Sequence, residues 1–246
     1  MTTEIDRHVF VIFGGTGDLA RRKLIPSLYR LITENGIADR CVLLGVAPGD
    51  LDDDAYRAWT RAALKQTGVN DDDLEAWCDD NVFYQTLDRD PGSYERLRDR
   101  IETIEEDRHL PGNRAFYLAL PPSVFPSAIT GLGEAGLNES PGWTRLVIEK
   151  PIRTDLKSAR DLNSLVHNFF HEAQVYRIDH YLGKETVQTS WRPGSRTQCS
   201  RASGTGIGLN PWRSPSLRTL GSGRGRATTK RRALYETWCR TISPSC

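Results

Sequence analysis

The densest group of chemically active side chains in this sequence lies at residues 177–185, which read R-I-D-H-Y-L-G-K-E. An acid, an imidazole, a phenol and an ammonium surround one glycine there, which is more chemistry than ordinary packing requires. An imidazole and an ammonium can together hold a dianion through charge-assisted hydrogen bonds. The run therefore indicates a binding site for a phosphorylated substrate.

A second group lies near the N-terminus, where residues 14–20 read G-G-T-G-D-L-A. Their spacing, G-x-x-G-x-x-A, departs from the strict G-x-G-x-x-G of dinucleotide-binding loops. The cluster follows an apolar run and opens a helical pattern, a context in which small residues let backbone N–H groups approach a pyrophosphate. The alternative is a glycine-rich turn that binds no ligand.

Hydrophobic periodicity predicts the elements that position these groups. Residues 9–13 form a continuous apolar run that ends in glycines, which is typical of a strand buried on both faces of a parallel sheet. From Leu19 onward, leucines at three- and four-residue spacing predict a helix. Residues 41–47 predict a second strand, which closes a β-α-β unit.

The alternation continues along the chain. Further helices are expected at residues 52–66, 94–105, 123–134 and 155–170, and further strands at 82–85, 114–120 and 144–149. Strands and helices that alternate at these lengths predict an α/β fold with a Rossmann-like, doubly wound parallel sheet through about residue 178.

Three motifs in this order resemble the glucose-6-phosphate dehydrogenase family: the glycine cluster, Glu149-Lys150-Pro151 and the run at 177–185. The resemblance covers roughly residues 6–188. It implies an oxidoreductase of the pentose phosphate pathway that converts glucose 6-phosphate and NADP to 6-phosphogluconolactone and NADPH.

The resemblance also implies roles for individual residues. The implied coenzyme-binding residues are Gly14, Gly15, Thr16, Gly17, Asp18, Leu19, Tyr117 and Lys150, and the implied substrate-binding residues are Lys150, His180, Tyr181 and Lys184. The catalytic residues would be Asp179, which in this family orients a general-base His, and Lys184. Pro151 resembles the prolyl turn that directs Lys150 toward both coenzyme and substrate.

The choice between NADP and NAD depends on the segment after the second strand. The family commonly places a cation there to meet the 2′-phosphate of NADP, but this sequence has Pro48. Asp50 favours an unphosphorylated ribose. Arg21, Arg22 and Lys23 could compensate in part, or water could simply solvate them. We therefore expect NADP and leave NAD open.

The composition changes sharply after Gln188. Up to that residue the chain has 22 basic and 31 acidic residues, and beyond it 11 basic residues face the single acid Glu236. Residues 189–246 are rich in Ser, Thr, Gly and Arg and sustain no helix or strand period, so by themselves they cannot bury enough apolar surface to order. We expect a dinucleotide-binding domain at 1–188 and a basic, disordered tail at 189–246.

The resemblance also stops there. The family's general base lies downstream, in a segment resembling R-D-M-V-Q-N-H-L, whereas none of the five histidines of this chain follows His180. We expect that the chain lacks this base and the family's second, β+α domain, that the family's homo-oligomer interface is lost, and that the chain is inactive.

We hypothesise that a frameshift near Thr189 produced the tail. In the original reading frame, each codon would consist of the last nucleotide of one present codon and the first two nucleotides of the next. Read in that frame, residues 233–243 permit A-L-R-D-M-V-Q-N-H-L, which is the family's segment with the general-base His. The Trp238/Cys239 junction must then give Val, because Trp has one codon. In the same frame, residues 203–218 permit a run resembling the start of the family's second domain.

A binding module is the competing interpretation. Eleven cations in a 58-residue tail would support non-specific, salt-sensitive attraction to nucleic acid. The tail has neither interleaved aromatic residues nor a recognised motif, and a segment translated out of frame explains the same charge. We therefore expect no specific nucleic-acid partner.

The remaining composition indicates a soluble globular protein. The chain has 246 residues, of which 38% are hydrophobic, enough for a sizeable core. Its five cysteines have no paired spacing, so neither a zinc site nor a disulfide framework is expected. The N-terminus carries Glu4, Asp6 and only a short apolar run, which predicts no signal peptide or membrane span and a cytoplasmic location.

Overall fold

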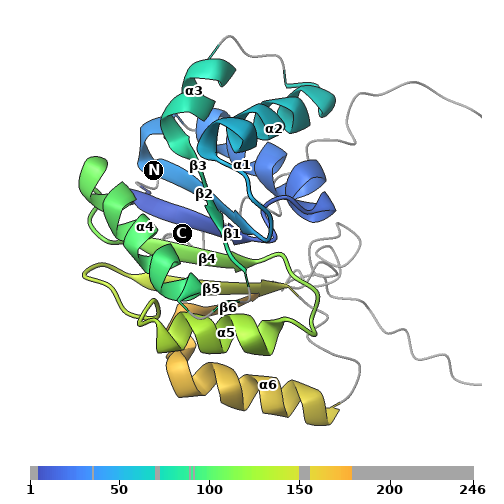
Figure 1. Cartoon of the computed structure of the whole chain (residues 1–246), viewed down its shortest axis with the longest axis vertical. Coiled ribbons are helices and arrows are strands. Elements are labelled where there is room, and N and C mark those ends of the chain that lie inside the picture. Colours follow the sequence, from blue (N-terminus) through green and yellow to red (C-terminus); the bar gives the residue numbers. More distant parts are fainter. Residues whose placement is uncertain are drawn as a thin grey trace, which may run out of the picture.

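Figure 1 shows the computed structural model, which describes residues 5–34, 36–69, 73–88, 90, 92–149 and 156–178. Within these residues, six parallel strands form one sheet: β1 His8–Phe13, β2 Cys41–Ala47, β3 Val82–Thr86, β4 Arg114–Leu118, β5 Thr144–Glu149 and β6 Val175–Ile178. The α-helices are α1 Ile25–Glu34, α2 Asp53–Gln66, α3 Leu74–Asn81, α4 Ser93–Asp107, α5 Phe125–Glu134 and α6 Leu156–Phe169, and the short helices are η1 Ala20–Leu24, η2 Ala38–Arg40 and η3 Glu172–Gln174.

The strand order is β3-β2-β1-β4-β5-β6. The chain adds β2 and β3 on one side of β1, then crosses to β4 and adds β5 and β6 on the other side. This reversal between β1 and β4 is a topological switch point, where open α/β sheets bind their ligands outside the carboxyl ends of the strands. The predicted doubly wound, Rossmann-like sheet is confirmed.

Each face of the sheet carries its own apolar core. Phe10 and Ile12 of β1 pack with residues of α1, α2 and α3, whereas Val9, Val11 and Phe13 pack with residues of α4, α5 and α6. In Figure 1, α1, α2 and α3 lie together beside β1–β3, and α5 and α6 lie beside β5 and β6. Because both faces are covered, every residue of β1 and β2 is buried, which explains why both sequences are almost wholly apolar.

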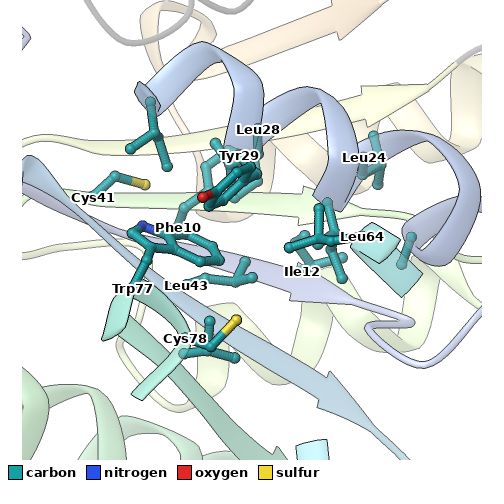
Figure 2. Packing of buried hydrophobic residues seen from close by; sticks show 14 of the residues in the cluster. Phe10, Ile12, Leu24, Leu28, Tyr29, Cys41, Leu43, Leu64, Trp77 and Cys78 are labelled. Atoms are coloured by element: carbon teal, nitrogen blue, oxygen red, sulfur yellow. The ribbon is translucent and has the colours of Figure 1, made fainter. Parts of the chain in front are cut away.

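Figure 2 shows the core beneath α1. The rings of Tyr29 and Trp77 meet edge to face, with centroids 5.0 Å apart, and this contact joins α1 to α3. Cys41 and Cys78 are buried free thiols in the same core. Burial raises the pKa of both thiols, that of Cys78 to about 12.

Local sequence sets where the first helices begin. Asp52 caps α2, since its carboxylate accepts a hydrogen bond of 2.7 Å from the N–H of Ala55. The helix after the glycine cluster instead opens with the π-helical turn η1, in which the N–H of Ile25 bonds to the carbonyl of Ala20. Pro26 has no N–H, and its ring crowds the carbonyl four residues earlier. The wider turn makes room for that ring.

A buried ion pair fixes the crossover helix α4 to the start of β4. Arg114 donates two hydrogen bonds, of 2.8 and 2.7 Å, to the two carboxylate oxygens of Glu105. Both residues are buried, so each charge depends on the other for its solvation. The pair lies at the amino end of β4, away from the glycine cluster.

The predicted elements are all present, with ends that differ by a few residues. Among the α-helices and strands, Leu74–Asn81 and Val175–Ile178 were not predicted from the sequence. The first is a helix of 8 residues and the second a strand of 4 residues, and both are too short for a hydrophobic period to show. The predicted tail at 189–246 lies outside the described residues, so the division into domains stays a prediction.

Candidate functional site

The glycine cluster lies at the switch point of the sheet. Phe13, the last residue of β1, pairs with Val46 of β2 and with Leu118 of β4. Leu118 pairs in turn with Ile148 of β5. The loops that follow β1, β2, β4 and β5 therefore leave the sheet side by side, and we call this row of strand ends the carboxyl edge.

Gly14 is required by its backbone conformation and by its surroundings. Its φ of +79° lies in the left-handed region, which favours glycine. A Cβ atom at this position would lie 2.6 Å from the carbonyl oxygen of Ala119, just beyond β4. The first glycine thus lets the loop after β1 run directly against the loop after β4.

Gly15 is required by its contact with the end of β2 and with α2. A Cβ atom there would lie 2.8 Å from the Cα of Gly45 and 3.0 Å from the hydroxyl of Tyr56. That hydroxyl donates a hydrogen bond of 3.1 Å to the carbonyl of Gly15. A Cβ at Gly45 would overlap the Tyr56 ring, so the two glycines make room for one buried tyrosine.

Backbone hydrogen bonds give the glycine loop its shape. The N–H groups of Gly14 and Gly15 both donate to the carbonyl of Val46, at 2.8 and 3.0 Å. The N–H of Gly17 donates to the carbonyl of Gly14 at 2.9 Å, and the N–H of Arg21 donates to the carbonyl of Gly17 at 3.0 Å. The loop therefore folds back on itself and passes into η1 without a break.

The turn after β2 is the second part of the carboxyl edge. Pro48, Gly49 and Asp50 are exposed there. The carbonyl of Gly49 accepts hydrogen bonds from the hydroxyl of Tyr84 at 3.1 Å and from that of Thr86 at 3.0 Å. This turn is thereby tied to β3, and it presents Asp50 rather than a cation.

The cations after the glycine loop differ in their surroundings. Arg22 forms an exposed ion pair of 2.7 Å with Asp18 of the loop. The Nε of Arg21 is buried and, among the described residues, has no hydrogen-bond partner. Lys23 is exposed. Of the three, Arg22 is therefore already engaged within the loop.

Tyr117 was predicted to bind the coenzyme, and in the structure its side chain lies mostly in the core, beneath the carboxyl edge. Its side chain is 3% exposed, and its hydroxyl donates a short hydrogen bond to the carboxylate of Glu149, the last residue of β5. Burial and the Glu149 charge raise the pKa of Tyr117, so the phenol stays protonated as a donor. Tyr117 therefore holds Glu149 in place at the carboxyl edge.

The run at residues 177–185 begins at the end of β6, with Arg177 and Ile178. Arg177 forms an ion pair of 2.7 Å with Glu172 and donates a hydrogen bond of 2.7 Å to Asn163 of α6. The Arg177 guanidinium also lowers the pKa of Glu172. Ile178 pairs with Glu149, so β5 and β6 end beside each other. Lys150, Asp179, His180, Tyr181 and Lys184 lie outside the described residues, and their roles stay predictions.

The residues Gly45, Tyr56 and Tyr84, which support the loops of the site, were not predicted from the sequence. A glycine in the middle of a buried strand was the available signal for Gly45, because it marks a close approach of other groups.

In the part of the chain that the structure describes, no group of three or more His, Cys, Asp or Glu side chains is placed to hold a metal ion. No helix in that part has both the length and the apolar character of a membrane span.

A glycine loop at the switch point of a doubly wound sheet defines a Rossmann-like dinucleotide-binding domain. The family model for the glucose-6-phosphate dehydrogenase NAD binding domain matches residues 11–189, and the chain therefore belongs to the glucose-6-phosphate dehydrogenase family. The match ends close to the residue at which the composition of the sequence changes.

Individual relatives agree with this assignment. The chain is 42% identical over 181 residues to the glucose-6-phosphate 1-dehydrogenase of Aggregatibacter actinomycetemcomitans, which covers 72% of this chain and 36% of that protein. It is 39% identical over 193 residues to the glucose-6-phosphate 1-dehydrogenase of Bacillus subtilis, and this match covers 76% of this chain and 38% of that protein. A solved glucose-6-phosphate dehydrogenase in complex with its substrate glucose-6-phosphate matches with a TM-score of 0.67 and 35% identity, over 77% of this chain and 40% of that one. The chain thus spans less than two fifths of the length of these curated relatives.

Proposed function

We propose that the described part of this chain is the coenzyme-binding half of a glucose-6-phosphate dehydrogenase. The observation that carries the proposal is the glycine loop, where a side chain at Gly14 or Gly15 would strike backbone of a neighbouring loop or strand. Small residues in such a loop also let a pyrophosphate approach the backbone and the helix that follows.

Different segments of the chain would bind different parts of the dinucleotide. The N–H groups of Gly14, Gly15 and Gly17 already bond within the protein, so donors toward a pyrophosphate would come from Thr16 and the start of the helix. The adenosine ribose would lie against the turn at Pro48–Asp50. When bound, the nicotinamide accepts hydride from the substrate. Glu149, held by Tyr117, would lie on the side of the edge where that reaction takes place.

We propose NADP as the coenzyme, with only modest preference over NAD. Pro48 supplies no cation for a 2′-phosphate, and Asp50 on the same exposed turn would repel one. Calorimetric titration of the full chain with NADP and with NAD tests this directly. A strong preference for NADP would mean that Arg21 or Lys23 supplies the missing contact.

Glucose 6-phosphate is the substrate we propose for the intact enzyme. The resemblance assigns its phosphate to His180 and Lys184 and the region near its reacting carbon to Lys150. The ends of β5 and β6, which precede these segments, are neighbours in the sheet, so both segments start from one side of the carboxyl edge. A dianion held by an imidazole and an ammonium is favoured electrostatically.

We further propose that a polypeptide of these 246 residues does not oxidise glucose 6-phosphate, because no His follows His180 to act as the base that Asp179 would orient. Loss of a general base lowers a rate by about 10²–10⁴. The same gene with one base restored near codon 189 should produce NADPH in an absorbance assay. Robust turnover by the 246-residue chain, abolished by Asp179→Asn, would refute both the missing base and the frameshift.

The basic tail supports a second candidate, a non-catalytic nucleotide-binding module that associates with nucleic acid. Residues 189–246 carry 11 basic residues against one acidic residue. Binding of a mixed-sequence DNA duplex that weakens steeply with salt would favour this candidate. Unbroken coding sequence of the relatives' length after one restored base would favour the frameshift.

A further inference from the structure

We propose that Tyr56 and Tyr84 are positioning residues for the coenzyme. Their hydroxyl groups hold the loop after β1 and the turn after β2 in one relative arrangement before a dinucleotide binds. The inference rests on the proposed function, because it assigns these two segments to the pyrophosphate and to the adenosine ribose.

Tyr56 acts on the pyrophosphate side. It lies in the first turn of α2, is fully buried, and donates its hydrogen bond to the carbonyl of Gly15. The ring occupies the space that a side chain at Gly45 would fill. Gly45 belongs to β2 and Gly15 to the loop after β1, so one side chain of α2 contacts both.

Tyr84 acts on the ribose side. Its hydroxyl donates to the carbonyl of Ala47 at 2.8 Å and lies 3.1 Å from that of Gly49. These two carbonyls flank Pro48, at the position where the family commonly carries a cation. A β3 side chain therefore sets the path of the turn that would meet the 2′ position of the ribose.

The two tyrosines pack against each other, which couples the two segments. Their ring centroids are 5.1 Å apart, and Trp59 stacks on Tyr56 at 5.5 Å with an interplanar angle of 14°. Burial raises the pKa of both phenols, so both remain hydrogen-bond donors. A shift of one ring would displace the other and with it both segments.

The hydrogen bonds of the two tyrosines would affect dinucleotide affinity as well as the packing of the core. A hydrogen bond to a loop carbonyl selects one loop conformation, and affinity falls in proportion to the fraction of molecules that hold the competent conformation. Loss of one buried hydroxyl would therefore weaken dinucleotide binding beyond its effect on folding. The two hydroxyls should also affect NADP and NAD differently, because they hold different segments.

The test uses the full chain and three Tyr→Phe variants, which keep the ring and remove the hydroxyl. Tyr56→Phe and Tyr84→Phe each remove a hydroxyl that bonds to the carboxyl edge. Tyr94→Phe is the matched control, since Tyr94 lies in the core on the other face of the sheet, against Gly131 of α5. Calorimetry with NADP and with NAD measures each dissociation constant. Thermal unfolding of the same samples measures stability.

For Tyr56→Phe we expect an increase of about tenfold in both dissociation constants, as one lost hydrogen bond predicts. For Tyr84→Phe we expect NAD binding to weaken about tenfold and NADP binding to weaken less, because a released turn lets Asp50 move away from the 2′-phosphate. For Tyr94→Phe we expect both constants to match those of the unaltered chain.

The outcomes separate this inference from the function on which it rests. If the unaltered chain binds neither coenzyme, the proposed function fails and this inference fails with it. If the unaltered chain binds but the Tyr56 and Tyr84 variants bind equally well, the function stands and the positioning role is wrong. An equal loss of affinity in the Tyr94 variant would also overturn the role, since it would show a general effect of stability.

Discussion

Replacing Gly14 by alanine should lower the free energy of unfolding much more than replacing Gly68, a glycine with the same φ. Gly14 and Gly68 both have a φ of +79°. At Gly68 an added Cβ meets no atom within 4 Å, whereas at Gly14 it would lie 2.6 Å from the carbonyl oxygen of Ala119. The pair therefore separates the cost of a left-handed alanine from the cost of the contact between two loops.

The magnitudes follow from these two terms. A left-handed conformation costs alanine about 1–2 kcal/mol, and the stiffer unfolded chain returns about 0.4–1 kcal/mol of that. Gly68→Ala should then lose about 1 kcal/mol of unfolding free energy. Gly14→Ala adds an overpacking cost of about 1–3 kcal/mol, because the opposing atom is backbone and cannot rotate away. We expect a total loss of about 2–4 kcal/mol.

Urea unfolding followed by tryptophan fluorescence measures both losses, and calorimetry with NADP measures the effect on binding. Gly14→Ala should weaken NADP binding at least tenfold, since the loop must move away from β4 to relieve the contact. Gly68→Ala, at the end of α2, should leave the dissociation constant unchanged. Equal stability losses in the two variants, together with unchanged NADP binding in both, would refute the close approach of the two loops.

Three further predictions concern groups buried away from the edge. Glu105→Ala should lose about 3–5 kcal/mol of unfolding free energy in urea, because it leaves the Arg114 guanidinium buried without its partner; a loss below 1 kcal/mol would contradict this. Burial lowers the pKa of His8 from 6.5 to about 4, so the unfolded chain binds a proton that the folded chain does not between these values. Stability should therefore fall by about 2 kcal/mol from pH 7 to pH 5 in urea titrations, and this His8 contribution should be missing from His8→Asn. Cys41 and Cys78, buried and with raised pKa values, should react with a thiol reagent at pH 8 only as fast as the chain unfolds, which mass spectrometry of labelled peptides would show.

The sheet was predictable from sequence because burial on two faces produces an unmistakable pattern. β1 and β2 are almost wholly apolar, since all their residues except His8 and Gly45 belong to one of the two cores. The misses were elements too short for a period to show. β6 has 4 residues, of which only Val175 is buried, and its place in the sheet comes from pairing with β5 rather than from its own composition.

The candidate site was predictable in its loops and not in the side chains that support them. Gly14, Gly15 and Gly17 stand out because glycine spacing is local in sequence. Tyr56 is 41 residues from the carbonyl that it contacts, and nothing in the surrounding D-A-Y-R-A distinguishes it from any other apolar position of an amphipathic helix. Contacts of this kind arise only after the sheet has brought β1, β2 and α2 together.

The role of Tyr117 in coenzyme binding stays a prediction, and its surroundings in the structure are those of a core residue. The strand that carries it ends at the carboxyl edge, yet alternation along β4 turns its ring into the core shared with Phe10. Among the described residues, its hydroxyl bonds to the neighbouring carboxylate of Glu149. In the structure, the role of Tyr117 is therefore to orient the Glu149 carboxylate at the carboxyl edge.

On the proposed function, the strand order would place the two ends of the dinucleotide on two sides of the switch point. The tyrosine cluster lies on the β2 and β3 side, where Tyr84 fixes the turn that would meet the adenosine. Glu149 and the end of β6 lie on the other side, beyond β4. A dinucleotide that crosses the glycine loop with its adenosine over β2 must therefore extend its nicotinamide toward β4 and β5. The segments predicted to bind the sugar phosphate begin on that same side, so the proposed orientation would bring the nicotinamide near the proposed substrate, as hydride transfer requires.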